Sequence, residues 1–522
     1  MKPLPSFSPQ ILQIAQCAVC TWADRCANLG ERLALPNTTT WFTETVSSGT
    51  LLAFPDNHPT CNRLRQTVKT DFCRVAMSVT TSPTSNISLE AWLPFNWTGR
   101  FLSTGNGGLG GCIQYEDMAY AVKNGFATVG ANGGHNGTSG IAFYKNTGAI
   151  EDFAYRSVHT GVVIGKQVTE AFYGQEHTKS YFLGCSAGGR QGFKSAQDFP
   201  DDFDGIVAGA PAFAFNNLSS WRGHFLPITG APGAPSYLPP DLWSVVQQDV
   251  MRQCDGLDGF ADGIIEDPNL CQYRPEALIC NSSQSEDCLT KAQANTVRAV
   301  FSPLRSNGSY LVYPRLQPGV PYGPLVSGQP FQYSVDWFRY AIHNDPTWDP
   351  ATIGKEDFEA AWQSNLFNID TWEGDLSGAM SRGTKILHYH GLQDTKISSD
   401  NSMRYYIHVL RTMRVKPETL DDFYRYFRIS GLDHCSGGPG ATFIGNSEDT
   451  VHEDGPEGNV LSAMIKWVEE GIAPESILGA AYVNGSKNSG KVAFQRRHCK
   501  YPLRNMYDGV GDPRLPDSWK CV

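Results

Sequence analysis

The chain has 522 residues, of which 41% are hydrophobic and 18% are charged, and its net charge at pH 7 is -10. This length exceeds that of an ordinary single domain, so we expect two domains or one large domain with an insertion. The acidic balance excludes the basic surface typical of nucleic-acid-binding proteins, and no apolar run is long enough to cross a bilayer. We therefore expect no nucleic-acid or membrane partner.

Cysteines and glycosylation sequons both indicate secretion. The chain has 14 cysteines, and no two Cys-x-x-Cys units occur together with zinc-site spacing, so the cysteines are typical of a disulfide-bonded extracellular protein. Residues 1–25 are an uncertain segment that resembles a weak signal peptide, because glutamines interrupt its apolar stretch. Asn-x-Ser/Thr sequons, which favour glycosylation of a secreted chain, begin at Asn37, Asn86, Asn96, Asn136, Asn217, Asn281, Asn307 and Asn484.

Short apolar runs and helix-like segments follow one another along the chain. Strands are predicted at residues 88–94, 100–104, 126–131, 180–184, 205–209, 385–389 and 424–429. Helices are predicted at residues 157–173, 190–198 and 460–470. This alternation predicts a mostly parallel sheet with helices on both faces. Proline, glycine and cysteine become frequent between residues 216 and 378, so we expect a lid domain (216–378) inserted into a catalytic domain formed by residues 26–215 and 379–522.

Residues 184–188 read Gly-Cys-Ser-Ala-Gly and stand between a predicted strand and a predicted helix. Strand, tight turn and helix are the setting in which Gly-x-Ser-x-Gly forms the nucleophile elbow of an α/β-hydrolase. The motif without its flanks would be an ordinary glycine-rich turn. With them, it predicts Ser186 as a nucleophile.

A serine nucleophile needs a general base and an acid that orients the base. Two segments that follow predicted strands supply candidates, one with His390 and Asp394 and the other with Asp433 and His434. The chain order Ser, Asp, His of α/β-hydrolases favours Asp394 as the orienting acid and His434 as the base. His390 is a rival base that precedes the acid, and Asp433 is a rival acid that is badly placed to brace the ring of its own neighbour.

Two cysteines adjoin the predicted nucleophile and base, because Cys185 precedes Ser186 and Cys435 follows His434. A nucleophile and its base must lie within about 3 Å of each other. This allows the two cysteines to lie within the roughly 4.4–6.8 Å between Cα atoms that a disulfide spans. We predict this disulfide, the alternative being two independent thiols, and it distinguishes His434 among the 12 histidines.

The sequence resembles the fungal tannase and feruloyl esterase family, most closely the type B feruloyl esterases. The resemblance begins near residue 61 and rests on motifs such as Asp-Phe-Cys-Arg at 71–74, the glycine-rich segment 99–108, and residues 134–137, 152–156, 184–192, 203–211 and 430–435. It implies an α/β-hydrolase fold with a large inserted lid domain, the triad Ser186, Asp394 and His434, and the disulfide already predicted. It further implies the pairs Cys26–Cys73, Cys61–Cys112, Cys254–Cys271, Cys280–Cys288 and Cys499–Cys521, and it gives Cys17 and Cys20 no place.

An oxyanion hole needs two preorganised N–H donors. We expect one from the backbone of Ala187, directly after the nucleophile. The glycine-rich loop 105–111 is expected to supply the other, with Gly107 and Gly108 as candidates. The loop could instead be a flexible turn, while a nucleotide-binding role lacks the Gly-x-Gly-x-x-Gly pattern followed by a ribose-binding acid.

Three aspartates lie close together in the glycine-rich segment 254–267. Such carboxylates repel one another unless a cation lies between them, and oxygen ligands in a flexible loop suit Ca²⁺. An acidic solvated turn is the alternative. In agreement with the resemblance, we expect a structural calcium ion held by the side chains of Asp255, Asp258 and Asp262 and the carbonyls of Phe260 and Ile264.

The resemblance implies a secreted serine esterase that hydrolyses feruloyl esters of plant cell-wall polysaccharides such as arabinoxylan, or small phenolic esters, and releases ferulate. The reaction would pass through an acyl-enzyme and need no organic cofactor. One alternative is a tannase that cleaves gallate esters. A non-catalytic, wall-binding secreted glycoprotein is an alternative of another class.

Overall fold

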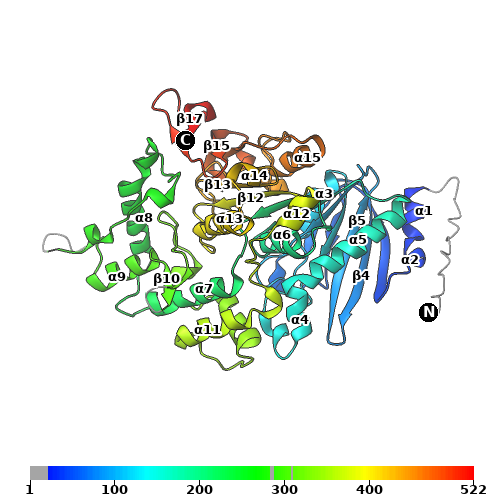
Figure 1. Cartoon of the computed structure of the whole chain (residues 1–522), viewed down its shortest axis with the longest axis horizontal. Coiled ribbons are helices and arrows are strands. Elements are labelled where there is room, and N and C mark those ends of the chain that lie inside the picture. The colour runs from blue at the N-terminus through cyan, green and yellow to red at the C-terminus, as the bar shows by residue number, and fades with distance from the viewer. Residues whose placement is uncertain (1–20, 282–286, 307–309) are drawn as a thin grey trace.

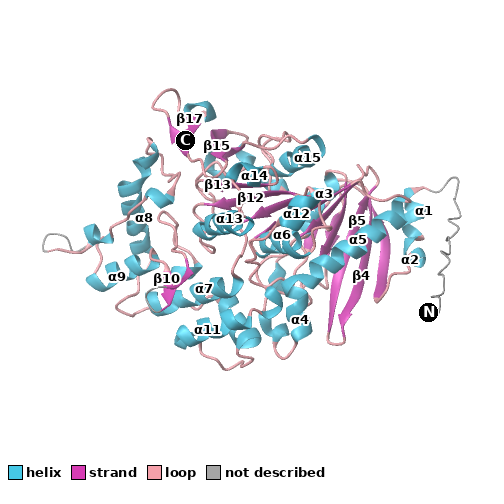
Figure 2. Ribbon diagram, in the orientation of Figure 1, coloured by secondary structure: helices cyan, strands magenta, loops and turns pink. Residues whose placement is uncertain are grey.

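The computed structural model describes residues 21–281, 287–306 and 310–522, and a large twisted sheet crosses its centre (Figures 1 and 2). Within these residues the sheet has nine strands. In spatial order they are β1 (Thr38–Val46), β4 (Phe72–Ser82), β5 (Ser85–Pro94), β7 (Phe126–Ala131), β6 (Arg100–Thr104), β8 (Lys179–Cys185), β9 (Gly205–Gly209), β12 (Lys385–Gly391) and β13 (Tyr424–Ile429).

The part of the sheet from β7 to β13 is parallel, and β1, β4 and β5 extend it with antiparallel strands. All seven predicted strands are present, four of them with the predicted bounds. β5 begins at Ser85 rather than at residue 88, and β12 continues to Gly391. β1 and β4 are strands that the sequence analysis missed.

Helices cover both faces of the parallel strands. One face carries α5 (Ser157–Tyr173), α6 (Ala187–Asp198) and α13 (Ser399–Met413), and the other carries α3 (Tyr115–Lys123) and α15 (Val460–Glu470). Successive side chains of a strand point to opposite faces, so in β8 Phe182 joins the first core while Tyr181 and Leu183 join the second. This double burial explains why β8 is a continuous apolar run.

The segment between β9 and β12 is the large insertion, seen on the side of the molecule away from β1 and β4 (Figure 1). Many of its buried residues, among them Trp221, Trp243 and Trp337, belong to a core cluster that also includes Phe153 from the part of the chain before β8. The parallel sheet with this insertion confirms the predicted fold class, while the exact limits 216–378 stay a prediction. The inserted elements are α7 (Phe215–Thr229), α8 (Pro240–Cys254), α9 (Lys291–Val300), β10 (Leu304–Ser306), β11 (Tyr310–Tyr313), α10 (Gln332–Asp336) and α11 (Lys355–Ser364).

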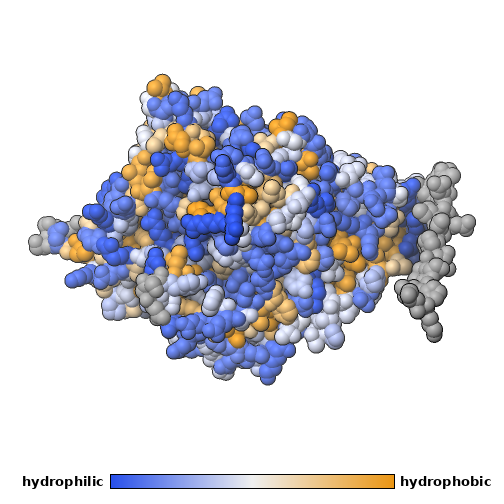
Figure 3. Space-filling model, viewed as in Figure 1, coloured by the Kyte–Doolittle hydropathy of each residue, from blue (hydrophilic) through white to orange (hydrophobic). Residues whose placement is uncertain are grey.

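Shorter elements complete the described residues. None of the helices there is long and apolar enough to cross a membrane. In the view of Figure 3, apolar residues occur in separate small areas of a mainly hydrophilic face. These elements are α1 (Trp22–Ala27), α2 (Leu29–Arg32), β2 (Leu51–Ala53), β3 (Arg65–Thr67), α4 (Thr147–Glu151), α12 (Ser377–Arg382), α14 (Pro417–Asp421), β14 (Ser476–Tyr482), β15 (Val492–Cys499), β16 (Asn505–Tyr507) and β17 (Trp519–Cys521).

Disulfides pair every cysteine of the described residues. Each of the six predicted pairings is present, with Cα atoms 5.0–6.1 Å apart. Cys17 and Cys20 lie outside the described residues.

Candidate active site

Ser186 lies on the sharp turn between β8 and α6 and has a φ of 66°, a value that residues with a side chain rarely adopt. The strained turn is held from both sides. The Ser186 N–H donates to the Gly209 carbonyl at 2.9 Å, and the Ser186 carbonyl accepts from Ala212 at 3.1 Å. A Cβ at Gly189 would overlap the Gly209 carbonyl oxygen, so only glycine lets α6 approach β9 this closely. The serine therefore stands at the carboxyl end of the parallel strands.

The three side chains predicted as catalytic form one hydrogen-bonded chain. The Ser186 hydroxyl lies 2.9 Å from His434 Nε2, and His434 Nδ1 lies 2.8 Å from Asp394 Oδ2. Both distances are those of a serine, a general base and its orienting acid. The three residues follow β8, β12 and β13, whose carboxyl ends meet at one edge of the sheet.

Asp394 is buried, with 1% of its surface exposed, and its second oxygen is also occupied. Oδ1 accepts the backbone N–H groups of Lys396 at 2.8 Å and Ile397 at 2.9 Å. Burial alone would raise the pKa of Asp394, but the charge and hydrogen bonds of His434 and His390 hold it well below its ordinary value. The carboxylate is therefore ionised when it receives the imidazole N–H.

His390 and Asp433, the alternative base and acid, lie beside the triad and outside it. His390 is fully buried and donates from Nε2 to Asp394 Oδ2 at 3.1 Å, while the Ser402 hydroxyl holds its Nδ1 at 2.7 Å. Asp433 accepts from the backbone and hydroxyl of Thr395 and from the backbone N–H of His434. Neither occupies the place of base or acid next to Ser186.

The Cys185–Cys435 disulfide joins the turn of the serine to the loop of the histidine. Its Cα atoms are 6.1 Å apart, and the two residues are separated by 250 positions in the chain. Cys435 also has a positive φ, 65°, and its carbonyl accepts from Asn446 at 2.8 Å. The cross-link thus fixes two strained turns relative to each other.

Three backbone N–H groups predicted as oxyanion donors lie around the serine. Ala187 is the first residue of α6, where N–H groups have no acceptor within the helix. In the described part of the chain, the N–H groups of Gly107 and Gly108 donate to no protein acceptor, whereas the Asn106 N–H is taken by Gln191 at 2.8 Å. Gly107, Gly108, Ser186 and Ala187 line the same cavity.

This cavity has a volume of about 720 Å³ and opens between the sheet and the lid. The lid contributes Phe215, Arg222 and Tyr333 to its lining, and the part of the chain before β6 and the helix α3 contribute Arg63 and Asp117. Sequence analysis missed these lining residues, because nothing in their local pattern shows which side of a lid helix or loop faces the serine.

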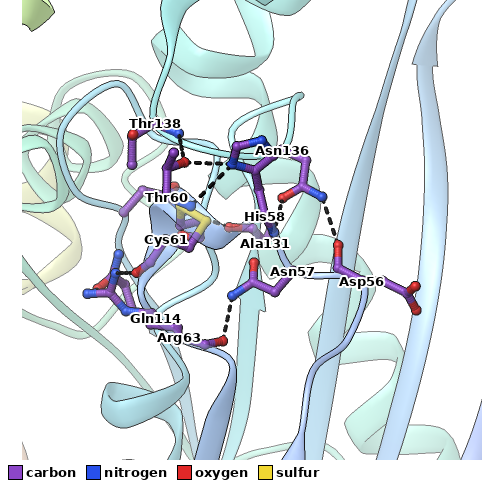
Figure 4. Close-up of a disulfide and its surroundings, with 12 residues drawn as sticks. Asp56, Asn57, His58, Thr60, Cys61, Arg63, Gln114, Ala131, Asn136 and Thr138 are labelled. Atoms are coloured by element: carbon purple, nitrogen blue, oxygen red, sulfur yellow. Dashed lines mark hydrogen bonds between the residues drawn. A yellow bond between two sulfur atoms is a disulfide. The ribbon is translucent and has the colours of Figure 1, made fainter.

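Figure 4 shows the disulfide Cys61–Cys112, whose two residues also line the cavity. Arg63 donates there to the carbonyl of Cys61 at 3.0 Å and to the Gln114 side chain at 2.5 Å. Nearby, the Asn136 side chain donates to the Asp56 carbonyl at 2.9 Å and accepts from the His58 N–H at 3.1 Å. The amide of this sequon thus already joins two loops.

Sequon asparagines differ in accessibility. Asn217 is half-buried in α7, and Asn307 lies outside the described residues. The exposed ones are Asn37, Asn86, Asn96, Asn136, Asn281 and Asn484.

In the predicted calcium loop, backbone N–H groups donate to the loop's own aspartate side chains. Asp255 accepts the N–H groups of Gly263 and Ile264, and Asp258 accepts those of Phe260 and Glu266. Asp262 forms an ion pair with Arg496 at 2.8 Å. The oxygen donors suit Ca²⁺ chemically, but in the described residues no three acidic, histidine or cysteine side chains are already placed to hold one ion. Binding would need the loop to adjust and the carbonyls of Phe260 and Ile264 to contribute.

Comparison with known proteins identifies relatives along nearly the whole chain. The family model described as "Tannase and feruloyl esterase" matches residues 73–318 and 338–522. A probable feruloyl esterase B-2 of Aspergillus oryzae is 53% identical over 506 residues, 96% of each chain. Feruloyl esterase C of Talaromyces stipitatus is 53% identical over 96% of this chain and 95% of its own.

Solved structures agree with these relatives. Feruloyl esterase B from Aspergillus oryzae is 48% identical and superposes with a TM-score of 0.94, covering 96% of this chain and 100% of its own. A tannin acyl hydrolase from Aspergillus niger, 21% identical, shares the fold with a TM-score of 0.74 over 96% of this chain and 95% of its own. The chain belongs to the tannase and feruloyl esterase family and is a carboxylic-ester hydrolase.

Proposed function

We propose that this enzyme is a secreted serine esterase that hydrolyses feruloyl esters of plant cell-wall polysaccharides such as arabinoxylan, or small phenolic esters, and so releases ferulate. The observation that carries the proposal is the hydrogen-bonded chain from Ser186 through His434 to Asp394, in a chain 53% identical to proteins named feruloyl esterase.

In the proposed reaction, Ser186 attacks the ester carbonyl while His434 takes its proton. Asp394 holds the imidazole in the required tautomer and stabilises the imidazolium. His434 then returns the proton to the departing alcohol, which leaves a feruloyl-enzyme. Water, activated by the same histidine, attacks this acyl-enzyme and releases ferulate.

The developing oxyanion needs donors that are in place before the reaction. We propose the backbone N–H of Ala187 as one donor and that of Gly107 or Gly108 as the other. Their position around the same cavity as Ser186 supports this assignment.

Two further properties belong to the proposal. Six disulfides and several exposed sequons support secretion and glycosylation. The three aspartates of the 254–267 loop support a structural calcium ion, whose role would be to stabilise the loop and not to take part in the ester chemistry.

The rates of hydrolysis of methyl ferulate, caffeate, p-coumarate and gallate test the proposal. We expect the hydroxycinnamates to be preferred and Ser186→Ala to lose at least about 1,000-fold in kcat. Ser489→Ala, which changes an exposed serine, is the matched control and should keep full activity.

Other outcomes would favour the alternatives. A strong preference for methyl gallate would make the enzyme a tannase with the same triad. Full activity in Ser186→Ala would refute the mechanism. Binding of cell-wall polysaccharide without hydrolysis of any ester would leave only a wall-binding role.

A further inference from the structure

Arg222 is a buried arginine that makes few polar contacts with the described part of the protein. It lies on α7 in the lid wall of the active-site cavity, and 6% of its surface is exposed. Within the described residues its one hydrogen bond runs from Nε to the Lys396 carbonyl at 2.8 Å. It forms no ion pair with any described aspartate or glutamate, so both terminal nitrogens are left with N–H groups to donate.

The other buried arginines of the described chain use their terminal nitrogens within the protein. Arg74 pairs with Glu90 at 2.6 Å, and Arg496 pairs with Glu266 and Asp262. Arg190 donates to the carbonyls of Phe153 and Ala154. A buried cation without such partners is costly. The terminal N–H groups of Arg222 are therefore available to donate to a ligand in the cavity.

The surroundings of Arg222 suit an aromatic ligand. Its guanidinium lies 5.0 Å from the ring centroid of Phe331, and Phe215 and Tyr333 line the cavity together with Arg222. Burial lowers the pKa of Arg222 to about 10, so the side chain keeps its charge at neutral pH. The lid wall thus combines apolar ring surfaces with one planar hydrogen-bond donor.

We propose that Arg222 binds the phenolic hydroxyl of the substrate's acyl group, donating to its oxygen, and so selects hydroxylated aromatic acids. The inference rests on the proposed function and names the group that would determine its specificity. In the proposed binding mode, the ester carbonyl of the substrate lies at Ser186 and its aromatic ring packs against the lid. The phenolic hydroxyl then enters an apolar wall, where it needs a hydrogen-bond donor. A site built to hydrogen-bond a hydroxyl discriminates against analogues that lack it.

The test compares esters with and without that hydroxyl. Arg222→Met should lower kcat/KM for methyl p-coumarate by about 10- to 100-fold, the effect of losing a charged hydrogen bond, and leave methyl cinnamate within about 3-fold. Arg222→Lys should restore part of the loss, since it keeps the charge without the planar fork. Arg404→Met removes a half-buried arginine that does not line the cavity, and it should change neither ester.

Binding to the inactive enzyme gives a second readout. In Ser186→Ala, bound methyl p-coumarate should absorb at longer wavelength, because a cation at the hydroxyl favours phenolate character. Ser186→Ala with Arg222→Met should lose that shift.

Equal losses on methyl p-coumarate and methyl cinnamate would overturn the proposal, as would a loss confined to esters whose alcohol carries a carboxylate. If the wild type hydrolyses methyl gallate but no hydroxycinnamate, the proposed function fails, and methyl gallate against methyl benzoate then tests Arg222 in the same way.

Discussion

Both carboxylate oxygens of Asp394 are held in place by hydrogen bonds. Two backbone N–H groups hold Oδ1, and His434 and His390 share Oδ2. Because Ser402 in turn holds His390, rotation of the carboxylate would break several buried hydrogen bonds at once. His434 therefore receives a fixed partner, and its ring is aimed at Ser186.

The lowered pKa of Asp394 makes a prediction about stability. A carboxyl whose pKa is lowered by folding stabilises the folded protein above the unfolded-state pKa, about 4, and loses that contribution as the pH falls. Asp394→Asn should therefore lower the Tm more at pH 6 than at pH 3. Thermal unfolding of both proteins at several pH values measures this difference, and a difference independent of pH would contradict it.

Asp394→Asn should also lower kcat by about 1,000- to 10,000-fold, because the amide favours the wrong histidine tautomer. Asp433→Asn is its matched control. The Asp433 carboxylate contacts Thr395 and the backbone of His434, and not the ring, so its loss of activity should be much smaller.

At the scale of elements, the sequence predicted the strands and helices whose local apolar pattern is regular. β8, the elbow and α5 were identified because burial on both faces or along one stripe leaves a regular apolar pattern. β4 was missed because Arg74, buried in a pair with Glu90 of β5, interrupts its apolar run. β1 was missed because most of its residues are exposed or half-buried at the sheet edge.

The triad could be predicted from a motif and from chain order, and the disulfide from two adjacent cysteines. The cavity wall could not. Arg222 and Tyr333 come from lid elements separated by proline- and glycine-rich turns, and only tertiary packing decides which of their side chains face the serine.

The Cys185–Cys435 disulfide connects two of the elements that carry the site. In the chain-entropy account, closing so long a loop is worth about 5 kcal/mol. Cys185→Ser with Cys435→Ser should lower the Tm and also kcat, since the turns of Ser186 and His434 lose their mutual constraint. Tm and kcat of the purified double variant provide the measurement.

Cys499–Cys521, which closes a loop with a separation of 22 residues, is the matched control. By the same relation its loss costs about 3 kcal/mol. Cys499→Ser with Cys521→Ser should lower the Tm but preserve kcat. If the Cys185–Cys435 variant also kept its kcat, the disulfide would be a stabilising cross-link alone.

At the scale of the whole molecule, the 254–267 loop connects the lid to the C-terminal part of the chain. It follows α8, and its residues pair with Arg496 on β15 and, through Asp267, with Arg428 on β13 at 3.1 Å. Ile264 packs near Gly431, close in sequence to His434. The short helical turn Asp255–Asp258 of the loop contacts β16 of this C-terminal part. Order in the loop is therefore linked to both the lid and the catalytic histidine.

Removal of calcium tests this link. A ligand that binds only the folded protein raises its stability, so a chelator should lower the Tm, and added Ca²⁺ but not Mg²⁺ should restore it. Elemental analysis should find calcium in the purified enzyme. Asp258→Asn should have a lowered Tm that the chelator no longer changes, whereas Asp345→Asn, an exposed lid aspartate, should behave as the wild type. Because Ile264 packs near the His434 loop, kcat should fall together with the Tm.

The opposite outcome would be a purified protein that contains no calcium and whose Tm the chelator does not change. It would show that Arg496 and the loop's own N–H groups are enough to hold the three carboxylates.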